Sequence, residues 1–120
     1  MSLDALVVED DPASCAALAE LLDIYGFAPR TAITLAEARQ ALHTTTPDLL
    51  VIDHHLPDGD GLDLLRELTQ TPRPAIICIS GDDSLEPPIA PGDLVYVLQK
   101  PLDITRLKAA LTAISERARM

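Results

Sequence analysis

Five residues with reactive side chains each stand at or just beyond the end of a short apolar run: Glu9, Asp10, Asp53, Ser80 and Lys100. A carboxylate can attack phosphorus as a nucleophile, while an ammonium group and a hydroxyl can stabilise the oxygens of a transferred phosphoryl group. Grouped carboxylates repel one another, and a hard divalent cation such as Mg²⁺, which prefers oxygen ligands, relieves the repulsion. If the fold brings these five residues together, their side chains indicate phosphoryl transfer assisted by Mg²⁺.

The central stretch of the chain, residues 49–61, reads LLVIDHHLPDGDG. A continuous apolar run that ends in turn residues is typical of a strand buried on both faces of a parallel sheet. Asp53 stands where that strand ends, and open α/β sheets bind ligands at the carboxyl ends of their strands. Taken alone, Asp53 could equally be a loop-capping residue. The reactive residues after the other strands favour a chemical role.

Apolar runs alternate with helical patterns along the chain. The pattern predicts strands at residues 6–8, 27–32, 49–53, 75–79 and 95–98, and helices that begin near Pro12, Thr34, Gly61 and Asp103. The last helix is expected to bury four residues: Ile104, Leu107, Leu111 and Ile114. Strands that alternate with helices predict a doubly wound α/β fold with a parallel sheet and helices on both faces. The carboxyl ends of such strands share one edge, so the five reactive residues should converge there.

Local signals mark several helix ends. Pro12 suits a first helical turn, Gly26 suits the position just after a helix, and Thr34 with Glu37 forms a capping-box pattern. The segment at residues 82–93 is different, because it holds three prolines that oppose a regular helix. A fourth helix there should be short or irregular.

Length and composition are typical of one domain over residues 1–120, of which residues 1–3 are a candidate expression remnant. The net charge of -10 repels phosphate backbones and anionic lipid, which argues against nucleic-acid and membrane binding by this segment. The sequence has no apolar run of membrane-spanning length and no signal-peptide pattern. Cys15 and Cys78 are too few for a disulfide framework or a zinc site, so a cytoplasmic location is expected.

The reactive residues stand in four short motifs, in the order Glu9-Asp10, Asp53-x-x-Leu56-Pro57-x-x-x-Gly61, Ser80-Gly81 and Lys100-Pro101. Together these motifs resemble the receiver domains of response regulators, the chemotaxis-regulator-like phosphoacceptors of two-component systems. Each motif is weak alone, but the ordered set is specific and covers essentially the whole chain. The stretch at residues 97–102 looks most like receivers attached to hybrid sensor histidine kinases.

The resemblance implies a site in which Asp53 is phosphorylated with help from Ser80 and Lys100, and Mg²⁺ is held by Glu9, Asp10, Asp53 and the main-chain carbonyl of His55. Asp10 would bind the ion directly, Glu9 would bind it through water, and Lys100–Pro101 would be a cis peptide. The implied fold is flavodoxin-like, with five parallel strands in the order 2-1-3-4-5.

The resemblance also implies a bacterial signalling protein of a phosphorelay, one that modifies itself and does not turn over an external substrate. The expected partner is a sensor histidine kinase or a histidine phosphotransfer protein. The output domain stays unidentified, and the chain could be a monomer or a dimer.

Three departures from the family pattern matter. The position that often carries a switching aromatic, three residues before the lysine, is Val97, and Tyr96 beside it should face the other way. The prolines of residues 82–93 should reshape the usual output face. His54 and His55 follow Asp53 directly, and we expect loop side chains flanking the pocket more than imidazole metal ligands.

Other functions remain open on the sequence. A pseudo-receiver would bind partners without phosphorylation, which the missing aromatic favours and the complete reactive set opposes. A haloacid-dehalogenase-type phosphatase also uses a nucleophilic Asp with Mg²⁺, but it carries a second Asp where this chain has His55, and it is usually larger. A flavin- or nucleotide-binding flavodoxin relative would place phosphate near the first helix, where Glu9, Asp10 and Asp11 repel it.

Overall fold

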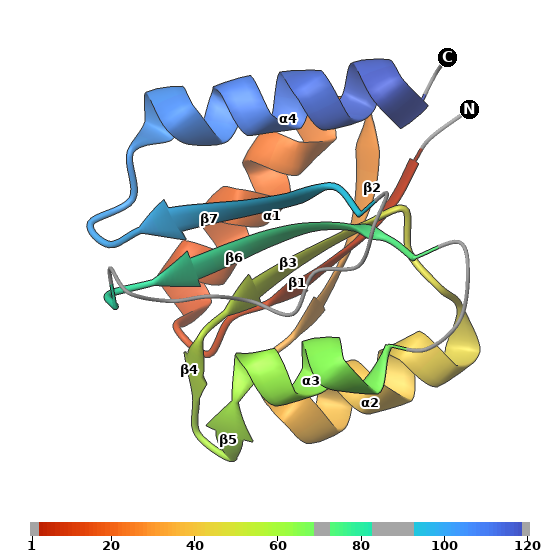
Figure 1. Ribbon diagram of the computed structural model, residues 1–120, viewed down its shortest axis with the longest axis vertical. Coiled ribbons are helices and arrows are strands. Elements are labelled where there is room, and N and C mark those ends of the chain that lie inside the picture. Colours follow the sequence, from red (N-terminus) through yellow and green to blue (C-terminus); the bar gives the residue numbers. More distant parts are fainter. Residues whose placement is uncertain (1–2, 69–72, 83–92, 119–120) are drawn as a thin grey trace.

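The computed structural model describes residues 3–68, 73–82 and 93–118, in which strands and helices alternate as predicted (Figure 1). In chain order the elements are β1 (Leu3–Val8), α1 (Pro12–Ile24), β2 (Phe27–Ala32), α2 (Leu35–Thr44), β3 (Leu49–Asp53), β4 (His55–Leu56), β5 (Gly59–Asp60), α3 (Gly61–Glu67), β6 (Ala75–Ser80), β7 (Val95–Gln99) and α4 (Ile104–Ala118). The predicted irregular segment at residues 82–93 lies, from 83 to 92, outside the described residues.

Five strands form one parallel sheet in the order β2-β1-β3-β6-β7. Counted along the chain without the short strands β4 and β5, which pair with each other, this is the predicted order 2-1-3-4-5. The register sets Asp53 beside Ile79 and Ser80 beside Gln99. The strands on which the reactive residues depend therefore finish at one edge of the sheet.

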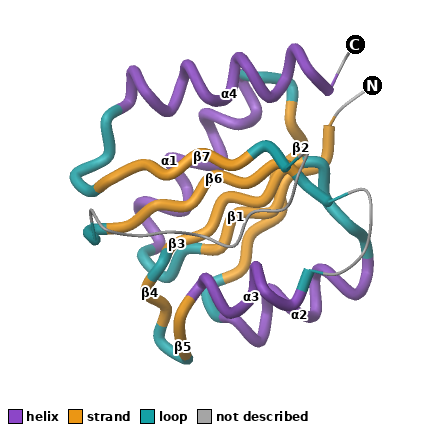
Figure 2. The backbone as a smooth tube through the Cα atoms, in the orientation of Figure 1, coloured by secondary structure: helices purple, strands orange, loops and turns teal. Residues whose placement is uncertain are grey.

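Helices cover both faces of this sheet, with α1 and α4 on one face and α2 and α3 on the other (Figures 1 and 2). Alternate residues of each strand enter two separate apolar cores. Val51 and Ile77 pack toward α1 and α4, while Ile52 and Cys78 pack toward α2 and α3. We call these two sides of the sheet the α1/α4 face and the α2/α3 face.

The predicted helix ends are confirmed. Pro12 is the first residue of α1, Gly26 follows its end with a φ of 90°, and the Thr34 side chain accepts the Glu37 N–H at 3.1 Å. Among the described residues, no helix is both long enough and apolar enough to cross a membrane.

One predicted core residue is misplaced. Leu107, Leu111 and Ile114 of α4 are buried as expected, but Ile104 keeps 51% of its surface exposed. Ile104 is the first residue of α4, directly after Asp103, whose carboxylate caps the helix by accepting the Thr105 N–H at 2.9 Å. The periodicity gives the face of the helix correctly, but it does not show that the first turn extends past the packed core.

Gly61 is required by a close approach at the start of α3. Its N–H donates to the His54 carbonyl at 2.7 Å, and a β-carbon at this position would clash with the main-chain oxygen of Asp53. A side chain here would push backbone against backbone, which has no flexible end to give way.

We therefore expect Gly61→Ala to lower the free energy of unfolding by about 2 kcal/mol in urea titrations. Gly81→Ala is the matched control, because a β-carbon on Gly81 would meet no atom within 4 Å. Equal stability of the two variants would show that the contact between Gly61 and Asp53 is not tight.

Candidate functional site

Three carboxylates meet at the carboxyl edge of the sheet. Oxygen atoms of Glu9, Asp10 and Asp53 all lie within 4.8 Å of one another. Glu9 and Asp10 follow β1, and Asp53 is the last residue of β3, the strand hydrogen-bonded beside it. Glu9 and Asp53 are buried, whereas Asp10 is exposed. The structure thus brings together the three acids singled out in the sequence.

Lys100 supplies the positive charge of this group. Its Nζ lies 3.0 Å from Oδ1 and 3.2 Å from Oδ2 of Asp53. Partial burial by itself lowers the pKa of Lys100, but the hydrogen bond that Lys100 donates to Asp53 and the charges of Asp53 and Glu9 outweigh it, so the pKa is raised above its usual value. Lys100 therefore stays charged beside the carboxylate.

Burial beside a second carboxylate changes the acidity of Glu9. Burial, followed by the nearby charge of Asp53, raises the pKa of Glu9 from 4.5 to about 7, although the Asp11 N–H and Lys100 oppose the shift. Near neutral pH Glu9 therefore keeps a tendency to hold a proton. A metal cation beside the carboxylates would favour the charged form of Glu9.

Ser80 lies at the same edge, but its hydroxyl points away from this charge cluster. Ser80 is fully buried, its Oγ lies 2.8 Å from Nδ1 of His54, and the same oxygen accepts the Asp82 N–H at 2.9 Å. The Ser80 carbonyl accepts the Lys100 N–H at 2.8 Å. The backbone of Ser80 thus belongs to the site, while its side chain is engaged on the α2/α3 face.

The expectation for the two histidines is wrong for His54 and correct for His55. His55 is exposed and lines the cavity above the carboxylates. His54 is only 6% exposed, with Nδ1 near Ser80 and Nε2 3.3 Å from Oδ1 of Asp60. Strand alternation would have revealed this, because the residue after Asp53 must face the side opposite to Asp53.

Two acids were not anticipated as helix caps: Asp58 in the turn between β4 and β5, and Asp60 at the end of β5. Asp58 accepts the N–H groups of Leu35 and Ala36 at 2.8 and 3.1 Å, so this turn closes the amino end of α2. Asp60 accepts the Leu62 N–H at 2.8 Å and caps α3. An acid just before a helical pattern was the signal available for Asp60, whereas Asp58 caps a helix that is distant in the sequence and had no local signal.

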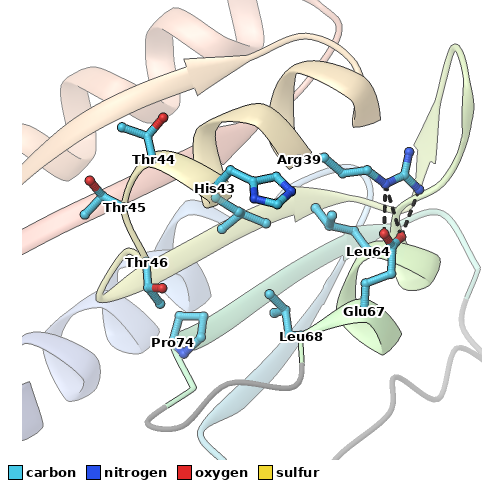
Figure 3. Close-up of a pocket in the computed structure, with 10 residues that line it drawn as sticks. Arg39, His43, Thr44, Thr45, Thr46, Leu64, Glu67, Leu68 and Pro74 are labelled. Atoms are coloured by element: carbon cyan, nitrogen blue, oxygen red, sulfur yellow. Dashed lines mark hydrogen bonds and ion pairs between the residues drawn. The ribbon is translucent and has the colours of Figure 1, made fainter.

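A cavity of about 530 Å³ opens over the carboxylates. Acids and Lys100 form one end of it, and apolar side chains of α1 and the start of α4, including Leu18, Leu21 and Ile104, form the other. A second cavity of about 330 Å³ lies between α2 and α3, walled by the ion pair of Arg39 and Glu67 at 2.8 Å (Figure 3). It contains none of the five reactive residues.

Val97, which stands three residues before Lys100, lies on β7 and is 37% exposed. Tyr96 packs against the core of the α1/α4 face, opposite to the side on which Val97 lies, as the alternation of strand side chains predicts. The Lys100–Pro101 peptide is cis, as expected.

Comparisons with known proteins agree with this architecture. A family model described as the response regulator receiver domain matches residues 5–112. The transcriptional regulatory protein DpiA of Escherichia coli (strain K12) is 32% identical over 124 residues, which cover 98% of this chain and 54% of that protein. The chain thus spans about half the length of the curated relatives it matches.

Solved structures give the same result. A CheY-like response regulator receiver domain from Methylobacillus flagellatus matches with a TM-score of 0.79 and 31% identity, covering 95% of this chain and 99% of that one. The beryllofluoride-activated NtrC4 receiver domain dimer matches with a TM-score of 0.78 and 27% identity, covering 95% and 97%.

The raised pKa of Glu9 predicts how stability depends on pH. Its folded-state pKa of about 7 exceeds the unfolded value of 4.5, so the folded state binds more protons between these values. The stability that comes from protonated Glu9 is therefore present at pH 4.5 and below, and it is lost as the pH rises through 7. With a chelator present, we expect Glu9→Gln to exceed wild type in stability by about 1 kcal/mol at pH 8, and by much less at pH 5.

Urea unfolding at the two pH values measures this difference. Glu20→Gln removes the same charge from an exposed position of α1 and should change little at either pH. Parallel pH profiles for wild type and Glu9→Gln would contradict the prediction.

Proposed function

We propose a function from one premise: this chain belongs to the response regulator receiver domain family of two-component systems. In the proposed function, Asp53 accepts a phosphoryl group from a phosphorylated histidine, and the modification changes the binding of a partner. The observation that carries the proposal is the contact of 3.0 Å between Lys100 Nζ and a buried Asp53 oxygen. A nucleophile and the cation that would stabilise the transferred group are already adjacent.

The transfer step is a displacement at phosphorus. An oxygen of Asp53 forms the new P–O bond while the P–N bond to the donor histidine breaks, and the leaving imidazole takes up a proton. Lys100 contacts both Asp53 oxygens, so it is placed to neutralise charge on the incoming phosphoryl oxygens. After transfer, the Ser80 hydroxyl donates a hydrogen bond to one of those oxygens. The chain modifies itself and acts on no external substrate.

The acidic cluster fits a divalent cation. Its carboxylate oxygens lie within 4.8 Å of one another, and burial together with the neighbouring charge of Asp53 raises the pKa of Glu9. Mg²⁺ would be held by Glu9, Asp10, Asp53 and the main-chain carbonyl of His55. When bound, the ion supplies the charge that a phosphoryl oxygen needs beside Asp53.

The proposed donor is a sensor histidine kinase or a histidine phosphotransfer protein. The cavity suits it, because apolar Leu18, Leu21 and Ile104 border the carboxylates and can receive apolar side chains around the donor histidine. The acidic net charge opposes direct nucleic-acid or membrane contact, and a cytoplasmic location follows from such a donor. Relatives are transcriptional regulators, so an output domain outside this segment and a dimer like that of NtrC4 belong to the proposal.

A phosphorylation-independent interaction module is the second candidate. Val97, in place of a switching aromatic, is the observation in its favour, because it removes one familiar read-out. The phosphatase reading gains nothing, since exposed His55 stands where that class needs an acid. Partner binding that is unchanged in Asp53→Ala would favour the second candidate.

Intact mass after treatment with acetyl phosphate tests the proposal. With Mg²⁺ we expect wild type to gain one phosphoryl group, about 80 Da, and Asp53→Ala to gain nothing, because the acceptor oxygen is gone. A chelator should abolish the gain. Lys100→Ala should reduce the yield at least about tenfold by removing the charge at Asp53.

Asp48→Ala is the matched control, because Asp48 also lies next to β3 but at its opposite, amino end. It should be modified as readily as wild type. An equal mass gain in Asp53→Ala would place the acceptor elsewhere, and no gain in wild type, with no beryllofluoride binding, would favour the interaction module.

A further inference from the structure

The buried imidazole of His54 has no part in the chemistry described so far. It lies on the α2/α3 face between two polar side chains, with Nδ1 2.8 Å from Ser80 Oγ and Nε2 3.3 Å from Asp60 Oδ1. The ring is 6% exposed and Ser80 is fully buried, so water competes little for these contacts. His54 thus links a residue of the proposed phosphoryl site to the capping residue of α3.

The partners assign the protons of this chain of contacts. A carboxylate offers only acceptors, so the contact of 3.3 Å between Nε2 and Asp60 favours the neutral tautomer with its proton on Nε2 and its lone pair on Nδ1. Ser80 Oγ accepts the Asp82 N–H at 2.9 Å. In that tautomer the Ser80 hydroxyl donates its hydrogen bond to Nδ1 of His54.

Strand alternation separates this contact from Asp53. His54 and Ser80 both point to the α2/α3 face, because each follows a residue, Asp53 or Ile79, that points to the α1/α4 face. A phosphoryl oxygen on Asp53 would be a second acceptor for the same proton. One proton cannot serve both acceptors fully.

We propose that His54 is a positioning residue, which holds the Ser80 hydroxyl away from Asp53 until a phosphoryl group competes for its proton. The inference rests on the proposed function, since that function supplies the competing acceptor. Forming the phosphorylated state then costs the hydrogen bond between Ser80 and His54. Losing it leaves the imidazole in contact with Asp60 and with the stacked ring of His55, whose centroid lies 4.2 Å away.

The metal-free protein provides the first test. Nitrogen-15 NMR of the histidine side chains should show His54 as the tautomer protonated at Nε2, with Nδ1 unprotonated and hydrogen-bonded. Ser80→Ala should shift the Nδ1 signal toward that of a free pyridine-type nitrogen. A protonated Nδ1, or a signal insensitive to Ser80→Ala, would overturn the inference without reference to phosphorylation.

The second test is binding of beryllofluoride, a phosphoryl analogue, followed by fluorine-19 NMR with excess Mg²⁺. His54→Leu removes the competing acceptor, so we expect about fivefold tighter binding, the size of one net neutral hydrogen bond. His54→Asn can place a carbonyl oxygen near the Nδ1 position and should bind like wild type. His54→Gln reaches toward Asp60 and should behave like His54→Leu.

The Ser80→Ala background separates positioning from general packing. There the hydroxyl proton is absent, so His54→Leu should leave the affinity for beryllofluoride unchanged. Equal affinities of wild type and His54→Leu, or the same gain in the Ser80→Ala background, would overturn the inference alone. No bound signal in wild type would overturn the proposed function and the competition with it.

Discussion

Alternation of side chains at the ends of β3 and β6 governs the whole carboxyl edge of the sheet. Asp53 ends β3 on one face, so His54 must turn to the other, and the parallel register gives Ser80 the same side as His54. Charged groups consequently gather on the α1/α4 face, where Lys100 meets Asp53. On the α2/α3 face Ser80 contacts His54, and the Asp60 carboxylate lies beside the imidazole. A register shift of one residue would exchange the two sets and dismantle both.

On the charged side of this edge, carboxylates outnumber the positive groups that contact them among the described residues. Glu9 and Asp53 are both nearly inaccessible to solvent, and the one ammonium group beside them is itself about half exposed. Burial and the nearby charge of Asp53 disfavour the charged form of Glu9 and raise its pKa, so the ionised Glu9 destabilises the fold. Packing of the strands on both faces must offset that cost. The same grouping of carboxylates favours the binding of a cation, and of a phosphoryl group that is bound together with that cation.

Much of this arrangement follows from the sequence, because short apolar strands and helical periodicity define the fold class and its carboxyl edge. The convergence of Asp53 with Glu9 and Lys100 needed only the parallel sheet. What the sequence did not reveal depends on three-dimensional detail. Burial of His54 required the face to be followed one residue past the strand, and exposure of Ile104 required knowing where α4 leaves the core.

The turn between β4 and β5 connects these observations to the rest of the molecule. Asp58 closes the amino end of α2, and Asp60 both caps α3 and approaches His54. Along the chain, three residues, His54, His55 and Leu56, separate Asp53 from this turn. Val97, by contrast, offers β7 no polar group with which to register a change at Asp53. The polar contacts of His54 with Ser80 and Asp60 can therefore transmit a change at Asp53 to the start of α3, whereas the apolar side chain of Val97 offers no such contact.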